Sequence, residues 1–211
     1  MSRVLVLATQ NPHKLAEIRA VLRDFDVQLR SCTDFSGCPE VVEDGDTLEA
    51  NAIKKAREIA AFTGECSLAD DTGLEVEALD GAPGVYSARW SGPGCTYDDN
   101  NAKLLRELEG VPAEQRTARF RCVMALVTPE PPPAGKVTFA PPRLFEGRLD
   151  GRIAEARRGS HGFGYDPLFY LPQEGCTLAE LSAARKNTIS HRARALQAFR
   201  NSMVVEWPKA H

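Results

Sequence analysis

The chain has 211 residues, of which 43% are hydrophobic and 26% are charged, and its formal net charge is −3. These values are typical of a globular protein with one large domain or two small lobes. The negative charge argues against nucleic acid as a partner, because binding a polyanion needs a concentrated basic surface. No run approaches the roughly 20 apolar residues of a membrane span, and the short apolar start is no secretion signal. We therefore expect no membrane partner and a cytoplasmic location.

The six cysteines are scattered along the chain, with no Cys-x-x-Cys spacing and no paired histidines nearby. This pattern argues against a zinc site. An even number of cysteines could form disulfides, but without a secretion signal we expect reduced thiols that fill apolar space.

Helices and strands alternate along the first half of the chain. Residues 4–8 form a continuous apolar run, as in a strand buried on both faces. Asn11 and Pro12 supply an N-cap and a first-turn proline for a helix to about residue 24. A second helix starts at Asp46 or Thr47 and stops at Gly64.

The same patterns predict the remaining elements. The sequence indicates a strand end at residues 68–69, a strand over 75–79, a helix over 98–108, a strand over 117–128 with one solvated edge or face, a proline-rich surface loop over 129–142, a strand over 143–149, a turn at Asp150-Gly151, and helices over 178–184 and 190–200. Together they predict a mixed α/β fold.

Two adjacent carboxylates, Asp70 and Asp71, follow the short apolar run that starts at Cys66. Ionising both at a partly desolvated strand end is costly, so a positive charge should offset them. A divalent metal with oxygen ligands is the simplest candidate, and Glu43 could share it. Alternatively, the pair only opens a solvated turn before Gly73.

Residues 9–14, Thr-Gln-Asn-Pro-His-Lys, join a buried strand to a helix start. Free backbone N–H groups and the positive helix end attract anions there, and the Lys14 ammonium could reach the same anion. The Gly-rich spacing of a Walker A loop is absent. A plain capped helix with a solvated lysine is the alternative. On the second helix, Lys55 is likewise expected to face solvent.

A glycine-rich run, Gly-Phe-Gly-Tyr-Asp-Pro, starts at Gly162. Glycines around an aromatic residue allow close approach of a ligand, and the Phe163 ring could stack on a nucleobase; a core-capping turn is the alternative. Further on, His191 and Arg192 lie at a helix start, where their charge opposes the helix dipole. An anionic or electron-rich ligand would explain them, as would a solvated basic turn.

These motifs occur in a fixed order. The order is Thr-x-Asn-x-x-Lys from Thr9, Ala-Asp-Asp-Thr-Gly-Leu from Ala69, Gly-Ala-Pro-Gly-Val-Tyr-Ser-Ala-Arg from Gly81, Gly-Phe-Gly-Tyr-Asp-Pro from Gly162 and Ser-His-Arg from Ser190. The series closely resembles the inosine/xanthosine triphosphate pyrophosphatase family, and the likeness runs from about residue 3 to residue 199.

The resemblance implies a single α/β domain over residues 1–211, with an elongated, twisted mixed β-sheet and flanking helices that form two lobes around a central cleft. It also implies a homodimer and Mg²⁺-dependent hydrolysis of ITP, dITP and XTP to the monophosphate and pyrophosphate. Glu43 and Asp71 would bind the metal with Asp70 beside them, and Asp71 would be the catalytic residue that activates water.

The family's other site residues carry over to the positions that match its motifs. Thr9, Asn11 and Lys14 would hold phosphates, Phe163 would stack on the purine, and Lys186, His191 and Arg192 would read the base. The full set of substrate contacts implied in this way is Thr9, Gln10, Asn11, Pro12, His13, Lys14, Lys55, Thr72, Phe163, Gly164, Tyr165, Asp166, Lys186, His191 and Arg192.

One position departs from the family pattern. The family often has Phe-x-Glu-Asn before the helix-borne lysine, whereas this chain has Leu48-Glu49-Ala50-Asn51. Ala50 therefore replaces an acidic residue, while Asn51 and Lys55 are kept. The departure affects only the local role of the missing glutamate.

Overall fold

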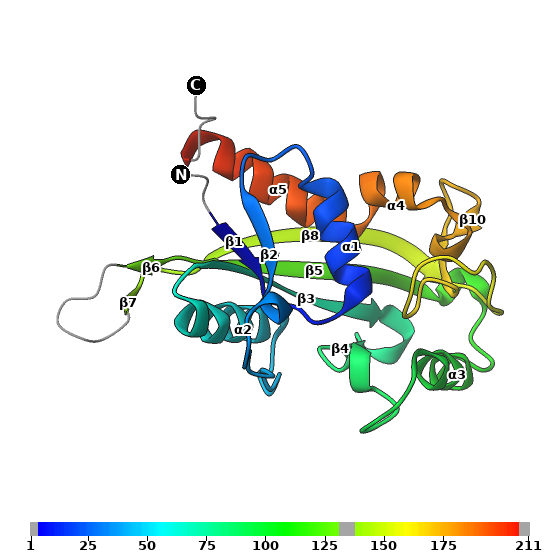
Figure 1. Ribbon diagram of the computed structural model, residues 1–211. Coiled ribbons are helices and arrows are strands. Elements are labelled where there is room, and N and C mark those ends of the chain that lie inside the picture. The colour runs from blue at the N-terminus through cyan, green and yellow to red at the C-terminus, as the bar shows by residue number, and fades with distance from the viewer. Residues whose placement is uncertain (1–3, 131–137, 207–211) are drawn as a thin grey trace. The chain divides into compact units, whose positions relative to one another are not determined.

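The computed structural model describes residues 4–130 and 138–206 (Figure 1). Contacts divide the chain into two compact units. The first consists of Met1–Asp71, Cys122–Gly147 and Arg192–His211, and the second of Thr72–Arg121 and Arg148–His191. Each unit has its own hydrophobic core, so each is described by itself.

Among the described residues, the main sheet joins eight strands in the order β10-β9-β8-β5-β3-β1-β2, with β4 paired to β3. The strands are β1 (Val4–Leu7), β2 (Gln28–Ser31), β3 (Cys66–Val76), β4 (Pro83–Gly84), β5 (Thr117–Val127), β8 (Arg143–Ile153), β9 (Phe169–Leu171) and β10 (Cys176–Thr177). β1 is parallel to β2 and β3, whereas β4 and β9 form antiparallel pairs. The mixed α/β fold is therefore confirmed.

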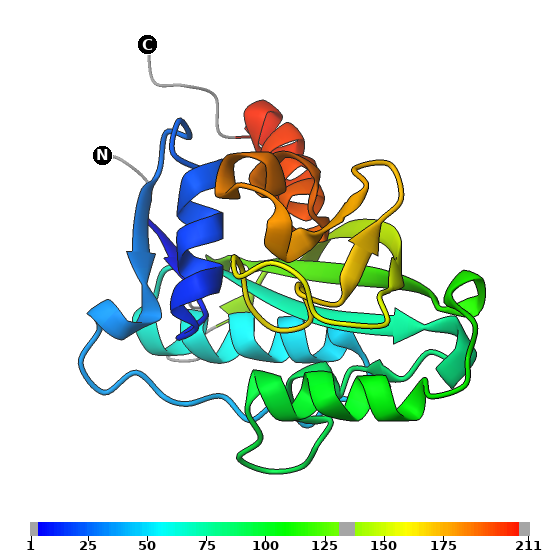
Figure 2. The same cartoon turned by 90° about the vertical axis from the view of Figure 1, so that its right-hand side faces the viewer.

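In the first unit, three helices cover the sheet. Helices α1 (Pro12–Val21) and α5 (His191–Glu206) lie on one face, and α2 (Leu48–Thr63) lies on the other (Figures 1 and 2). The core consists of fully buried side chains from β1, α1, β5 and α5, among them Leu5, Ile18, Met124 and Phe199.

The helix ends of the first unit follow the predicted signals. Asn11 caps α1 and Pro12 is its first residue, while Thr47 caps α2 through a hydrogen bond from the backbone N–H of Ala50. Gly64 ends α2 in the left-handed conformation, at φ 72°, which glycine adopts without steric cost. These predictions are confirmed.

In the second unit, α3 (Tyr97–Glu107) and α4 (Ala183–Ile189) lie on opposite faces of the sheet (Figures 1 and 2). Helix α3 begins with a capping box, in which the side chains of Thr96 and Asp99 each accept a hydrogen bond from the other's backbone N–H. The core gathers side chains of β3, α3, β5, β8 and β9, including Leu104 and Phe169. The predicted helix over 98–108 is thus confirmed, with its start one residue earlier.

Two predicted strand breaks are wrong. The structure has one continuous strand, β3, through Asp70 and Asp71, so neither the strand end at 68–69 nor the solvated turn before Gly73 exists. Similarly, β8 continues through Asp150-Gly151. Gly151 serves close packing there, because a Cβ at this position would lie 2.6 Å from the Phe169 ring and from the carbonyl oxygen of Tyr170.

Several other expectations need correction. The strand over 117–128 was expected to have one solvated edge or face. The alternation holds for residues 117–121, but residues 122–127 are buried on both faces, and β5 lies between β8 and β3 in the sheet. Within 129–142, β6 (Pro129–Glu130) pairs with β7 (Thr138–Phe139), residues 140–142 form loop, and residues 131–137 lie outside the described residues. The helix expected over 178–184 is a short 3-10 turn, Leu178–Glu180, followed by α4. Strand β2 was not predicted.

The six cysteines are free thiols, as expected. In the part of the chain that is described, none of the helices has the length and apolar character needed to cross a membrane.

Candidate active site

The turn between β1 and α1 is closed by its own side chains. The Asn11 side chain accepts hydrogen bonds from the backbone N–H groups of His13 (2.9 Å) and Lys14 (3.3 Å), and Pro12 has no N–H. The backbone N–H groups of His13 and Lys14 are therefore not free, contrary to the prediction for these two positions. An anion would be attracted here by the Lys14 ammonium and the positive end of the helix dipole.

Asp70 lies in a buried cluster of opposite charges. Its carboxylate oxygen Oδ2 is 3.1 Å from the Lys14 ammonium and accepts hydrogen bonds from Nε (3.2 Å) and Nη2 (3.1 Å) of Arg192. The Asp70 and Arg192 side chains are only 1% and 2% exposed. Burial alone would raise the pKa of Asp70, but the positive charges of Lys14, Arg192 and Lys55 outweigh it and hold that pKa far below its usual value.

Asp71 lies in a different cluster, formed with α2 and the segment before it. Asn51 donates a hydrogen bond to its Oδ2 (3.2 Å), and the Lys55 ammonium lies 3.4 Å from its Oδ1. The same ammonium is 2.6 Å from Glu43 Oε1 and 2.7 Å from the backbone carbonyl oxygen of Asp70. Lys55 is therefore buried, whereas the sequence predicted that it would face solvent.

The charges of this cluster shift the pKa values of Asp71 and Lys55. Burial raises the pKa of Asp71, Lys55 opposes that shift and Glu43 adds to it, so the net direction is upward. Burial alone would lower the pKa of Lys55, but Asp71, Glu43 and Asp70 outweigh it, so the ammonium stays charged.

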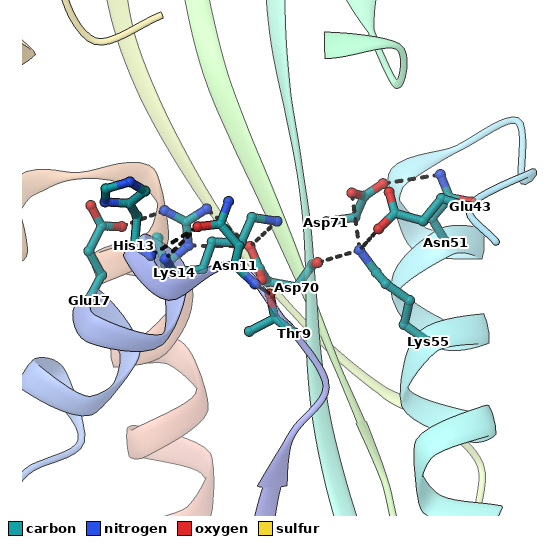
Figure 3. Close-up of polar contacts among 11 residues, drawn as sticks. Thr9, Asn11, His13, Lys14, Glu17, Glu43, Asn51, Lys55, Asp70 and Asp71 are labelled. Carbon is teal, nitrogen blue, oxygen red and sulfur yellow. Dashed lines mark hydrogen bonds and ion pairs between the residues drawn. The ribbon is translucent and has the colours of Figure 1, made fainter. Parts of the chain in front are cut away.

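The two carboxylates point to opposite sides of β3 (Figure 3). Asp70 points toward Lys14 on α1, and Asp71 points toward Lys55 on α2. Successive side chains of a strand alternate between its faces, so the unbroken strand separates the pair. Their mutual repulsion is thereby reduced, and each carboxylate has its own cation.

A magnesium ion fits the Asp71 side of the strand. Glu43 and Asp71 are hard oxygen donors that share one ammonium, and Mg²⁺ is commonly held by one or two carboxylates together with water and substrate phosphates. Among the described residues, no group of three or more His, Cys, Asp or Glu side chains is placed to hold a metal. The predicted trio of Glu43, Asp71 and Asp70 is thus not assembled, and metal binding by these residues stays a prediction.

In the second unit, Asp166 organises the glycine-rich run after Gly162. The buried Asp166 carboxylate accepts hydrogen bonds from the backbone N–H of Phe163 (2.9 Å) and from the Lys186 ammonium (2.5 Å). A Cβ at Gly162 would lie 2.1 Å from the Asp166 carboxylate, so only glycine fits there. The Lys186 ammonium also lies 4.9 Å from the centroid of the Phe163 ring.

Other residues predicted to contact the base are more enclosed. The hydroxyl of Tyr165 donates to the Ser87 carbonyl (2.9 Å), which fixes the ring inside the unit. The His191 ring is 4% exposed and stacks on Phe120 at 4.5 Å. Arg192 belongs to the first unit, where Asp70 and Glu17 hold its guanidinium.

The remaining predicted contacts lie at the edges of these groups. Thr9 and Thr72 are partly exposed, and Gln10, Pro12 and His13 are exposed at the start of α1. The predicted phosphate and metal residues thus lie in the first unit, with Asp70 and Asp71 in separate clusters on opposite sides of β3, whereas Phe163, Gly164, Tyr165, Asp166 and Lys186 lie in the second.

Three contributing residues received no role from the sequence. Glu17 pairs with Arg192, and its spacing of three residues from Lys14 on one helix face could have indicated it. Asn51 bridges Asp71 and the backbone N–H of Gly45 (2.8 Å). Asn101 is buried in α3, where asparagine is a poor helix former, and that misfit is its only sequence signal.

The replacement at Ala50 has a local explanation. Ala50 is the third residue of α2, the position where a glutamate would complete a capping box with Thr47. Only the Thr47 half of that box is present. The substitution therefore affects the helix start, while Asn51 and Lys55 keep their contacts.

Comparisons with known proteins identify the family. The sequence model of the Ham1 family matches residues 5–202. The chain is 48% identical over 205 residues to a dITP/XTP pyrophosphatase of Shouchella clausii, covering 97% of this chain and 98% of that protein. It is 51% identical over 199 residues to a dITP/XTP pyrophosphatase of Geobacter sulfurreducens, covering 94% and 96%.

A solved structure shows the same fold. The HAM1 protein of Coxiella burnetii superposes with a TM-score of 0.84 at 42% identity, covering 96% of this chain and 99% of that one. The match extends across nearly the whole length of both chains, and the family resemblance seen in the ordered motifs is confirmed. The chain belongs to the Ham1 family.

Proposed function

We propose that the protein is a nucleoside-triphosphate pyrophosphatase that hydrolyses dITP, ITP and XTP to the monophosphate and pyrophosphate. The names of its near full-length relatives support this activity. The observation that carries the proposal is the cluster of Asp71, Glu43 and Lys55, in which two carboxylates share one buried ammonium; such a set of charges could serve phosphoryl transfer.

In this proposal, the first unit binds the triphosphate. Lys14 is 17% exposed and is the one cation of the Asp70 cluster with appreciable solvent contact, so its ammonium can turn to a phosphate oxygen. Asp70 then keeps its two hydrogen bonds from Arg192. The Asn11 side chain fixes the backbone of the turn, and Thr9 contributes a hydroxyl group beside it.

Mg²⁺ would be held by Glu43 and Asp71, and when bound it would offset the charge that develops on the transferred phosphoryl group. The chain's own groups do the rest. Asn51 and Lys55 fix the Asp71 carboxylate from two sides. Lys55 also supplies a positive charge close to the reacting phosphates.

Asp71 would orient the attacking water and accept its proton. Attack on the α-phosphorus breaks the bond to the bridging oxygen and releases pyrophosphate, while the other product is the nucleoside monophosphate. A proton acceptor works best when its pKa is near the working pH. Burial and Glu43 raise the pKa of Asp71 in that direction.

The second unit would bind the base. The partly exposed Phe163 ring offers a stacking surface for the purine. Hypoxanthine and xanthine carry an acceptor oxygen at position 6, where adenine carries an amino donor. The Lys186 ammonium beside the ring is a donor, so it favours the oxygen, and a site built on such hydrogen bonds rejects the mismatched base strongly.

The test is pyrophosphate release from a panel of triphosphates, with and without Mg²⁺. We expect turnover of dITP, ITP and XTP only with Mg²⁺, and much slower turnover of dATP, whose base carries an amino donor at position 6. Faster turnover of a modified pyrimidine triphosphate would show that the substrates are modified pyrimidine nucleotides and not non-canonical purines. Nucleotide binding without pyrophosphate release from any member would overturn the proposal in favour of a sensing protein.

A homodimer is part of the same proposal and rests on the family resemblance alone. Light scattering of the purified chain would check it, and a monomer at working concentrations would contradict it.

A further inference from the structure

Two adjacent asparagines, Asn100 and Asn101, lie in the middle of α3, and both are buried. Asparagine disfavours helix interiors because its side chain competes for backbone hydrogen bonds. Each of these side chains instead bonds to a separate segment of the second unit. Asn100 donates to the Ala88 carbonyl (3.2 Å) and accepts from the Ser91 N–H (2.9 Å).

Asn101 reaches the glycine-rich run. Its amide nitrogen donates to the carbonyl oxygen of Gly164 (2.9 Å) and to that of Tyr97 in the preceding turn of α3 (2.8 Å). Its amide oxygen is buried and has no hydrogen-bond partner among the described residues. The position therefore keeps both donors at the cost of an unsatisfied acceptor, which an apolar side chain would avoid.

Gly164, whose carbonyl oxygen Asn101 holds, lies between two other fixed points of the glycine-rich run. Its φ is +64°, in the left-handed region, and a Cβ there would meet nothing within 4 Å, so backbone conformation alone requires the glycine. On one side, the Phe163 N–H is fixed by Asp166, and on the other the Tyr165 hydroxyl is fixed by Ser87. The peptide between these two anchors is fixed by Asn101.

The Phe163 ring depends on the same helix. Its centroid is 6.0 Å from that of Tyr97, at an interplanar angle of 44°. Tyr97 and Asn101 are four residues apart and share a face of α3. One face of α3 therefore lies against the Phe163 ring through Tyr97 and holds the backbone of the next residue, Gly164, through Asn101. Lys186 of α4 also lies over the Phe163 ring.

We infer that Asn101 is a positioning residue for base recognition: its amide fixes the Gly164 carbonyl and thereby the orientation of the Phe163 ring. The inference rests on the proposed function, in that Phe163 is taken to stack on the purine. The hydrogen-bond partners of Asn101, Tyr97 and Gly164, both belong to the second unit, so we expect its effect on the base and not on the phosphates.

The test compares ligands with and without a base. Asn101→Leu removes both donors at similar size, and Asn100→Leu is the matched control on the same helix. Calorimetry would measure binding of dIMP and of pyrophosphate to each variant. We expect Asn101→Leu to weaken dIMP binding about tenfold, the value of one good hydrogen bond, and to leave pyrophosphate binding unchanged. Asn100→Leu should leave both unchanged.

Kinetics and coupling separate positioning from general damage. With dITP, Asn101→Leu should raise KM with little change in kcat, because the base is remote from the reacting phosphorus. In a Phe163→Leu background, the same substitution should have almost no further effect on dIMP binding, since the ring that Asn101 positions is gone. If the leucine variant does not fold, Asn101→Asp replaces it in the same measurements, because it keeps the shape of the side chain and loses both donors. The same loss of dIMP binding is expected.

The outcomes distinguish the inference from the proposed function. Equal effects of the two asparagine variants, equal losses for dIMP and pyrophosphate, or full additivity with Phe163→Leu would overturn the role of Asn101. If the wild-type protein releases no pyrophosphate from any triphosphate yet binds dIMP in an Asn101-dependent way, the proposed function fails and the inference stands.

Discussion

Asp70 and Asp71 are neighbours in sequence and are both buried, yet their surroundings differ completely. Asp70 is enclosed by Lys14 and Arg192, with a pKa far below its usual value. Asp71 shares a single lysine with Glu43, and its pKa is raised. The comparison shows that one unbroken strand can assign adjacent carboxylates to different tasks by turning them to opposite faces. In the proposed mechanism, Asp70 stabilises the charge cluster and Asp71 is the carboxylate that takes part in the chemistry.

The largest effect is expected from Asp71→Asn. An amide cannot accept the proton of the attacking water, so kcat for dITP should fall by roughly 10²–10⁴-fold, the usual contribution of a general base. Substrate binding should be largely retained, because Lys14 and Phe163 are unchanged. Pyrophosphate release under saturating dITP and Mg²⁺ measures this effect. Turnover close to that of the wild type would remove Asp71 from the mechanism.

Asp70→Asn should act mainly on stability. It leaves the buried Arg192 and Lys14 without their shared anion, which costs about 3–5 kcal/mol in the free energy of unfolding when a buried pair loses one partner. Urea unfolding at neutral pH measures it. Asp44→Asn, which breaks the exposed pair with Lys54, is the control and should leave stability unchanged.

The same variant gives a pH prediction. The folded-state pKa of Asp70 is depressed below the reference value of 3.8, so its stabilising contribution is present above that pH and is lost as the pH falls through the depressed pKa. The stability difference between the wild type and Asp70→Asn should therefore be largest near neutrality and narrow in strong acid. A gap that widened on acidification would contradict the assigned charge state.

Lys55→Met should have a smaller effect that Mg²⁺ partly reverses. Without the ammonium, Glu43 and Asp71 face each other with no cation between them, so the metal-free protein should lose about 2 kcal/mol, typical of a hydrogen bond to a charged group. A bound cation would replace the lost charge, so Mg²⁺ should raise the melting temperature of this variant more than that of the wild type. An equal shift in both proteins would argue against a metal between these carboxylates.

Much of the fold follows from local signals in the sequence. The caps at Asn11 and Thr47 and the stop at Gly64 act within one helical turn, so these helix ends could be predicted. Strand continuity at Asp70-Asp71 could not, because the cations that stabilise both charges come from α1, α2 and α5. The turn expected at Asp150-Gly151 failed for a similar reason, since the close approach of β9 is a tertiary contact.

The candidate site, too, could be predicted from the sequence only in part. The ordered motifs identify Lys14, Asp71 and Phe163 as candidates, but sequence order does not show which way a side chain points. The contacts of Glu17 with Arg192 and of Asn101 with Gly164 join residues 175 and 63 positions apart. Such pairs appear only when the chain is folded.

The most direct test of the difference between the two faces is metal binding. Mn²⁺ in place of Mg²⁺ can be followed by electron paramagnetic resonance in the wild type, Glu43→Gln, Asp71→Asn and Asp70→Asn at low temperature, where all remain folded. We expect Glu43→Gln and Asp71→Asn each to weaken Mn²⁺ binding by at least about tenfold, since removing even a residue that only supports a metal ligand lowers metal affinity by that factor. Asp70→Asn should leave it unchanged. Loss of binding in Asp70→Asn, with binding retained in Asp71→Asn, would contradict the account.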